Sequence, residues 1–183
     1  MKQNRKRVEY TGMTVTSDFL FLGSSNLMKI KPEIMNNGST CEKVFCPTYT
    51  HLLDYLHHTQ VITHPKKVLI HCGTNDVEKK GFIEKNFEDT FIKAIFKLQE
   101  LFPSSQFIIS GILPRREISL NMFICNLNDF VAGCCSTLTN FTYMNNRNIT
   151  KTMLDDNKHV DRKGFSILLS NIRQSMFSII PKR

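Results

Sequence analysis

The chain has 183 residues, which is long enough for one domain with a sizeable hydrophobic core. Hydrophobic residues make up 41% and charged residues 22% of it, a globular composition that excludes an intrinsically disordered protein. The formal net charge of +8 and the pI near 9.3 favour contact with polyanions. No run approaches the roughly 20 consecutive apolar residues of a membrane span, so we expect no transmembrane segment.

Part of the positive charge lies at the two ends of the chain. The basic residues there are Lys2, Arg5, Lys6, Arg7, Lys182 and Arg183. We expect residues 1–12 to form a flexible basic segment, because polar chain ends are usually frayed. Charged ends of this kind predict at most a non-specific, salt-sensitive contact with nucleic acid.

The six cysteines show no spacing typical of a disulfide framework or a zinc site, and no C-x-x-C motif occurs. Free thiols in a reducing compartment are the simplest interpretation. The N-terminus has a basic start without an apolar stretch behind it, so no signal peptide is visible and we expect an intracellular protein. We expect neither a metal site nor a cofactor.

Short apolar runs alternate with longer amphipathic stretches along the chain. We expect strands at residues 18–22, 43–46, 67–72, 106–110 and 140–144. We expect helices at residues 49–59, 84–102, 120–136 and 163–180. This alternation predicts an α/β protein with a five-stranded parallel sheet and helices on both faces. In such a sheet, ligands bind at the carboxyl ends of the strands.

Polar residues follow three of these strands. The first strand ends in Gly23-Ser-Ser-Asn26, where small residues can turn the chain sharply and expose a hydroxyl at a helix start, although an ordinary helix cap has the same composition. The third strand ends in Gly73-Thr-Asn-Asp76, where an Asn side chain can donate to an oxyanion or merely form part of a polar loop. After the fifth strand, Asp156 precedes His159 by three residues, a spacing that lets a carboxylate orient an imidazole, unless the segment is a solvated acidic turn.

Taken together, these segments resemble the conserved blocks of the SGNH (GDSL-type) hydrolases. The similar segments are residues 19–27 (FLFLGSSNL), 68–76 (VLIHCGTND) and 156–159 (DNKH), the last followed by Gly164 and an apolar helix. The resemblance implies that residues 13–183 form one SGNH hydrolase-like domain, a three-layer α/β/α sandwich of flavodoxin-like type that hydrolyses esters. Residues 109–115 (ISGILPR) make the chain most similar to the SGNH domains of some retrotransposon and viral proteins.

The resemblance also assigns roles to individual residues. It makes Ser25 the nucleophile, His159 the general base and Asp156 the residue that orients His159. The oxyanion hole would consist of the Ser25 backbone N–H, the Asn75 side chain and the backbone N–H of Thr48. The implied substrate is a small-molecule or lipid ester of a carboxylic acid, cleaved through an acyl-enzyme.

Two departures from the family pattern predict a reduced activity. Ser24 stands where the family has Asp, and Thr48 where it has Gly. A Thr there can strain the loop or shift its amide, and a lost oxyanion donor costs about 10²–10³ in rate. Asn26, Arg115 and Arg116 are further candidates for substrate contact. The arginines would favour an anionic substrate, whereas the alternative interpretation is a solvated loop.

Two other functions stay open at this point. One is a catalytically weak or inactive SGNH-fold module that binds nucleic acid, a membrane or a protein partner through its basic surface. The other is a thiol enzyme that uses Cys72 or Cys125 with a histidine.

Overall fold

The computed structural model describes residues 9–31 and 38–177. Its helices and strands follow in this order: β1 (Thr14–Val15), β2 (Phe19–Gly23), α1 (Ser25–Met28), β3 (Cys41–Phe45), α2 (Tyr49–His58), β4 (Gln60–Val61), β5 (Lys67–His71), α3 (Thr74–Val77), α4 (Glu84–Leu101), β6 (Gln106–Ser110), α5 (Ile118–Ser136), β7 (Phe141–Met144), a 3-10 turn (Lys151–Met153) and α6 (Arg162–Phe177).

Five of the strands form one sheet with the order β3-β2-β5-β6-β7, and every pair in it is parallel. The expected five-stranded parallel sheet of flavodoxin-like type is therefore confirmed. In the register of the sheet, Gly23 at the end of β2 lies between Phe45 of β3 and His71 of β5. The carboxyl ends of these three strands thus meet at one edge, which carries the polar segments identified from the sequence.

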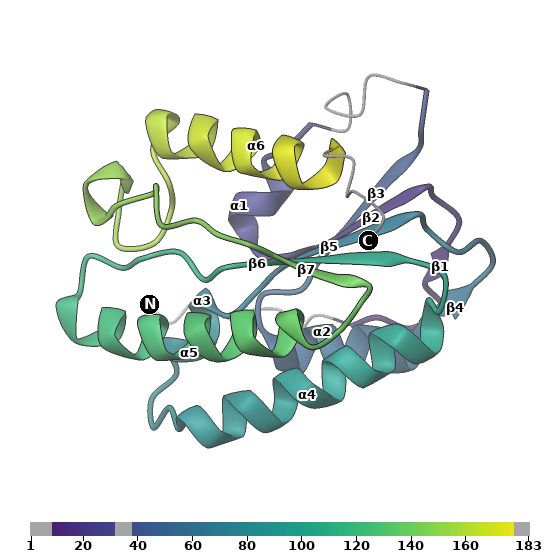
Figure 1. The fold of residues 1–183 in the computed structure, drawn as a ribbon, viewed down its shortest axis with the longest axis horizontal. Coiled ribbons are helices and arrows are strands. Elements are labelled where there is room, and N and C mark those ends of the chain that lie inside the picture. Colours follow the sequence, from purple (N-terminus) through teal and green to yellow (C-terminus); the bar gives the residue numbers. More distant parts are fainter. Residues whose placement is uncertain (1–8, 32–37, 178–183) are drawn as a thin grey trace.

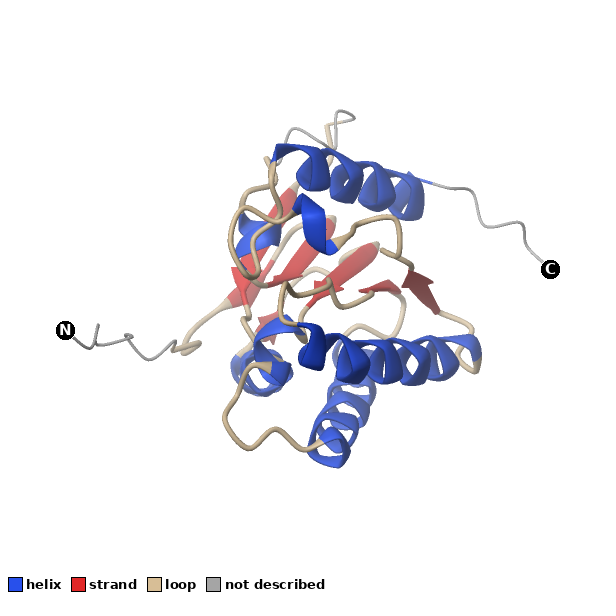
Figure 2. Ribbon diagram, turned by 90° about the vertical axis from the view of Figure 1, so that its left-hand side faces the viewer, coloured by secondary structure: helices blue, strands red, loops and turns tan. Residues whose placement is uncertain are grey.

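The sheet lies between two layers of helices, with α1 and α6 on one face and α2, α4 and α5 on the other (Figures 1 and 2). Residues of one strand alternate between the two faces. Leu20 and Leu22 of β2 belong to the core under α2, α4 and α5, whereas Phe19 and Phe21 belong to the core under α1 and α6. Both faces of the sheet are therefore buried, as the apolar strands predict.

All five expected strands and four expected helices are present, with ends shifted by a few residues. Residues 178–180 of the last expected helix lie outside the described residues. A second, two-stranded parallel sheet of β1 and β4 was not expected. Of the segment expected to be flexible, residues 1–8 with their basic side chains lie outside the described residues. In the remainder, Tyr10 is 3% exposed and its hydroxyl donates to the Phe45 carbonyl at 2.8 Å.

Helix α5 is long and apolar enough, by length and composition alone, to cross a membrane (mean hydropathy 1.2). Core helices of soluble proteins pass the same test. Here α5 covers the sheet, and Ile124, Leu127, Val131 and Cys135 are its buried residues. The absence of a transmembrane segment stays a prediction.

Candidate active site

Ser25 begins helix α1 directly after a tight turn at the end of β2. The Ser24 N–H donates to the His71 carbonyl at 3.0 Å, and the Ser24 carbonyl accepts the Leu27 N–H at 3.0 Å. Gly23 allows the close approach of β2 and β5 here, because a Cβ atom at this position would lie 2.6 Å from the His71 carbonyl oxygen. The turn thus fixes the Ser25 hydroxyl at the carboxyl edge of the sheet.

The structure brings Ser25, His159 and Asp156 into one hydrogen-bonded chain. His159 Nε2 lies 3.0 Å from Ser25 Oγ, and His159 Nδ1 lies 2.6 Å from Asp156 Oδ2. The other carboxylate oxygen, Asp156 Oδ1, accepts the backbone N–H groups of Lys158 and His159, each at 2.7 Å. The hydrogen bond from the His159 ring and then those from the two amides hold the pKa of Asp156 well below its usual range. The carboxylate is therefore ionised beside the imidazole.

Asn26 holds the loop that carries His159 in place through hydrogen bonds to its backbone. Its side chain is nearly inaccessible, with 3% exposed. Its Nδ2 donates to the Lys158 carbonyl and its Oδ1 accepts the Val160 N–H, both at 3.4 Å. The carboxamide thus holds the backbone on both sides of His159, and it is bonded to protein where a substrate contact was expected.

Asn75 and Thr48, the expected oxyanion donors, lie side by side although they follow different strands. Asn75 Nδ2 donates to the Pro47 carbonyl at 3.0 Å, and this carbonyl shares a peptide unit with the Thr48 N–H. Since β3 and β5 flank β2, this bond connects the loops on both sides of Ser25. A carboxamide has two N–H donors, so Asn75 keeps a second one for another acceptor.

The strain expected from Thr48 is a wrong prediction. The residue has φ −141° and ψ 165°, an extended conformation that needs no glycine. Its hydroxyl caps α2 by accepting the His51 N–H at 3.3 Å, and it also lies 2.7 Å from His51 Nδ1. The threonine therefore stabilises the loop that it was expected to distort.

Asp76 supports the same loop and was given no role from the sequence, although it belongs to the segment 73–76. Its Oδ2 accepts the Tyr49 N–H at 3.1 Å, one residue after Thr48. Burial raises the pKa of Asp76 to about 6, against the opposing effect of Lys79. Only its place in a recognisable motif could have pointed to this residue.

Arg115 and Arg116 make contacts within the protein. Arg115 is 1% exposed, and its Nη2 lies 3.0 Å from the Thr74 carbonyl and 3.1 Å from Glu78 Oε1. The alternative interpretation, in which both arginines belong to a solvated loop, is therefore wrong for Arg115. Arg116 is exposed and donates to the carbonyls of Leu154 and Asp155. Their expected contact with a substrate is untested.

A cavity of about 430 Å³ lies beside the loop that carries Asp156 and His159. Asn157, next to Asp156 in sequence, contributes to its wall together with Glu78, Lys79 and Arg115. Charged side chains of both signs thus line this cavity, whereas the three candidate triad residues do not.

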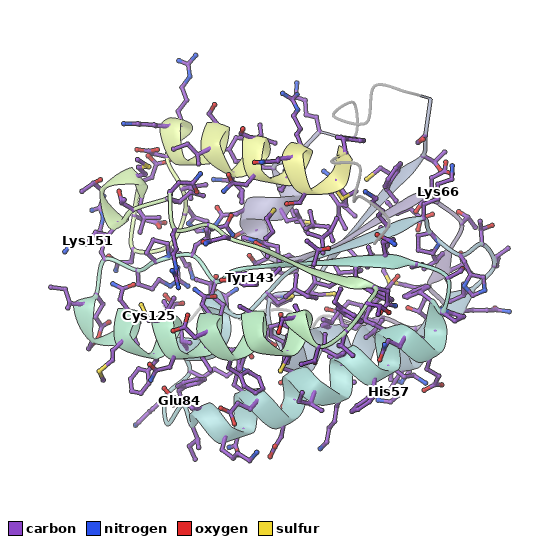
Figure 3. All side chains as sticks on the ribbon, in the orientation of Figure 1. His57, Lys66, Glu84, Cys125, Tyr143 and Lys151 are labelled. Atoms are coloured by element: carbon purple, nitrogen blue, oxygen red, sulfur yellow. The ribbon has the colours of Figure 1, made fainter. Side chains whose placement is uncertain are left out.

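The structure offers no support for a thiol nucleophile at either cysteine considered. Cys72 is buried, its Sγ donates to the Cys46 carbonyl at 3.1 Å, and burial raises the pKa of its thiol well above the ordinary value. Cys125 is exposed on α5, in the helix layer opposite α1, which carries Ser25 (Figure 3). In the part of the chain that the structure describes, no three His, Cys, Asp or Glu side chains gather in a group that could hold a metal ion.

No family model and no curated protein matches the chain. Solved structures do. A GDSL-like lipase from Bacteroides thetaiotaomicron is 16% identical with a TM-score of 0.70, and 86% of each chain is covered. A catalytic mutant of an acetylxylan esterase from Geobacillus stearothermophilus is 12% identical with a TM-score of 0.70, covering 94% of this chain and 98% of the other. The esterase domain of a zebrafish retrotransposon protein is 21% identical over 88% of this chain and 99% of its own, but its TM-score is 0.48.

These similarities show the fold: the chain has the three-layer architecture of the SGNH (GDSL-type) hydrolases. The narrower resemblance to proteins of mobile elements and viruses stays a prediction.

Proposed function

We propose that this SGNH-fold protein is a serine esterase that hydrolyses carboxylic esters through an acyl-enzyme. The observation that carries the proposal is the chain of hydrogen bonds from Ser25 Oγ to His159 at 3.0 Å and from His159 to Asp156 at 2.6 Å. A nucleophile, a base within hydrogen-bond reach and a carboxylate that orients the base are the parts that acyl transfer requires.

In the first half of the reaction, His159 Nε2 takes the proton of Ser25 while Ser25 Oγ attacks the ester carbonyl carbon. The negative charge then develops on the former carbonyl oxygen, where the N–H groups of Ser25, Thr48 and Asn75 stabilise it. His159 returns the proton to the leaving alcohol as the C–O bond breaks. In the second half, His159 deprotonates a water molecule, which attacks the acyl-enzyme and releases the carboxylic acid and free Ser25.

The charge of Asp156 also supports the proposal, because the mechanism requires a negative charge beside His159. Asp156 is ionised, so it stabilises the imidazolium that forms when His159 takes a proton.

The test compares Ser25→Ala with Ser24→Ala, which changes the neighbouring serine. A fluorophosphonate probe labels only an activated serine, so mass spectrometry of wild-type protein should find one labelled site, at Ser25. Ser25→Ala should lose labelling and its kcat on p-nitrophenyl acetate should fall by about 10⁶-fold. Ser24→Ala should keep both, because the Ser24 side chain makes no helix-capping hydrogen bond.

A wild-type protein that folds but neither labels nor hydrolyses the ester would contradict the proposal. That result would favour the inactive binding module, for which non-specific nucleic-acid contact through the basic ends remains the prediction.

A further inference from the structure

Two neighbouring arginines after β6 contact two different parts of the candidate active site. The segment that carries them is held to α5 by paired asparagine side chains. Asn128 binds both the N–H and the carbonyl of Ile112, at 2.7 and 3.1 Å. Asn121, two turns earlier on the helix, binds the N–H and the carbonyl of Arg115, at 2.8 and 2.7 Å. Each carboxamide pairs with the extended chain as a neighbouring strand would, so the arginines start from a fixed backbone.

Arg115 contacts the one-turn helix α3 at both ends. The carbonyl of Thr74, which accepts from Arg115 Nη2 at 3.0 Å, belongs to the first residue of α3. Glu78, which pairs with the same Nη2 at 3.1 Å, follows the last residue of α3. Asn75 lies between these contacts, so the guanidinium fixes the element that presents the candidate oxyanion donor.

Arg116 contacts the loop that carries Asp156 and His159, two of the three candidate triad residues. Its guanidinium donates to the carbonyls of Leu154 and Asp155, the two residues directly before Asp156. A further ion pair joins the two halves, because Glu78 Oε2 also lies 3.7 Å from Lys158 Nζ, next to His159. Arg115 and Glu78 therefore link α3 to Lys158 in the loop that carries Asp156 and His159. Arg116, next to Arg115 in the chain, contacts the same loop at Leu154 and Asp155.

The burial of Arg115 is poorly explained by stability alone. Its Nε and Nη1 are buried without a hydrogen-bond partner among the described residues. Burial lowers the pKa of the guanidinium, although the Glu78 and Asp156 carboxylates oppose this. A buried charge of this kind contributes little or nothing to stability compared with an apolar side chain of similar size. A role in holding particular groups in place accounts for it better.

We propose that Arg115 and Arg116 are positioning residues that hold the two halves of the catalytic centre together, Arg115 through α3 and Arg116 through the loop before Asp156. The kinetic part of this proposal rests on the proposed esterase function, whereas the structural part does not. Misplacing a catalytic group by about 1 Å can cost about 10²-fold in rate. The residues thus act on the reaction without touching the substrate.

The kinetic experiment compares Arg115→Met and Arg116→Ala with Arg147→Ala, an exposed arginine that pairs with exposed Asp129 on the surface. For both test variants, kcat on p-nitrophenyl acetate and the rate of fluorophosphonate labelling at Ser25 should fall by about 10²-fold with little change in KM. Arg147→Ala should match the wild type. If Arg115→Met fails to fold, Glu78→Ala breaks the same ion pair from its more exposed side.

Amide hydrogen exchange measures the positioning directly and needs no activity. In Arg116→Ala, the amides of Lys158 and His159, which donate to Asp156, should exchange faster than in the wild type. In Arg115→Met, the amides of Asp76 and Val77, which donate to the Gly73 carbonyl, should do so. Arg147→Ala should leave all four unchanged.

If these amides exchange hydrogen in both test variants at the same rate as in the wild type, the proposal is overturned, whatever happens to kcat. A lower kcat with unchanged exchange would indicate direct contact with the substrate. An inactive wild-type protein would contradict the esterase function alone, and the exchange rates would still decide the positioning role.

Discussion

At the candidate triad, the position of one proton decides whether His159 can act as a base. Asp156 Oδ2 is an ionised acceptor 2.6 Å from Nδ1, so it requires that nitrogen to carry the hydrogen. Nε2 is then left with a lone pair directed at the Ser25 hydroxyl, 3.0 Å away. Because Asp156 Oδ1 is held by two backbone amides, the carboxylate cannot easily turn away from the ring.

We therefore expect Asp156→Asn to lower kcat by about 10²–10⁴-fold with the fold intact. The Asn oxygen can still accept from the amides of Lys158 and His159, which leaves its NH₂ group facing His159 Nδ1. That arrangement favours the tautomer with hydrogen on Nε2, which cannot accept the Ser25 proton. Steady-state hydrolysis of p-nitrophenyl acetate measures the change. Asp155→Asn, a change at the adjacent exposed carboxylate, is the control and should keep wild-type kcat, and equal losses in both variants would refute the argument.

The sequence could predict which polar residues lie near this site but not what each of them contacts. Ser25, Asp156 and His159 follow strand ends or have helical spacing, and such features are visible without coordinates. The burial of Arg115 depends on Glu78, which is far away in sequence and belongs to no pattern. Likewise, no rule of composition says that the carboxamide of Asn26 reaches the backbone on both sides of His159.

At the level of single elements, the β2–α1 turn shows how the sheet determines the place of Ser25, the candidate nucleophile. Gly23 ends the strand, and its neighbour Ser24 is bonded to the His71 carbonyl. That carbonyl cannot retreat from an added side chain without breaking this bond. The geometry of Ser25 thus depends on a strand contact between β2 and β5.

A pair of glycine substitutions tests this dependence. The Cβ of Gly23→Ala would lie 2.6 Å from the His71 carbonyl oxygen and 2.9 Å from Leu27 Cδ2, so we expect a loss of about 1–3 kcal/mol in the free energy of unfolding, together with a lower kcat. Gly133→Ala, inside α5, where the new methyl would meet nothing within 4 Å apart from its chain neighbours and the adjacent helix backbone, should gain about 0.5–1 kcal/mol and keep wild-type kcat. Urea unfolding of both variants measures the difference. Equal stability of the two would show that the turn tolerates a side chain.

The elements to which the sequence analysis assigned no bounds are the short ones. Periodicity needs several residues to show itself, and β1 and β4 have two residues each, while α1 and α3 have four. These short helices carry Ser25 and Asn75. The parts of the chain that hold the candidate catalytic groups are thus those in which local pattern carries least information, and they were found through their motifs.

For the whole molecule, two buried titratable groups give the folded state opposite responses to pH. Burial raises the pKa of Asp76 to about 6, above its unfolded value of about 3.9, so its burial destabilises the protein progressively as the pH rises from about 4 to 6. Burial lowers the pKa of His71 to about 4, below its unfolded value of about 6.5, so its contribution to stability is lost as the pH falls from about 6.5 to 4. Across this window the two effects largely cancel.

We therefore expect the combined contribution of Asp76 and His71 to the free energy of unfolding to change little between about pH 4 and 6.5, and single substitutions to separate the two contributions. Relative to the wild type, Asp76→Asn, which keeps an acceptor for the Tyr49 N–H, should lose about 3 kcal/mol of stability as the pH falls through this range, because the His71 effect is then unopposed by Asp76. His71→Asn, whose carboxamide can still hydrogen-bond to Ser110, should gain about 3 kcal/mol over the same fall in pH, although its smaller side chain lowers its stability at every pH. Urea titrations at constant ionic strength measure these slopes. Parallel curves for the wild type and Asp76→Asn would mean that Asp76 titrates in the folded protein as it does in the unfolded chain.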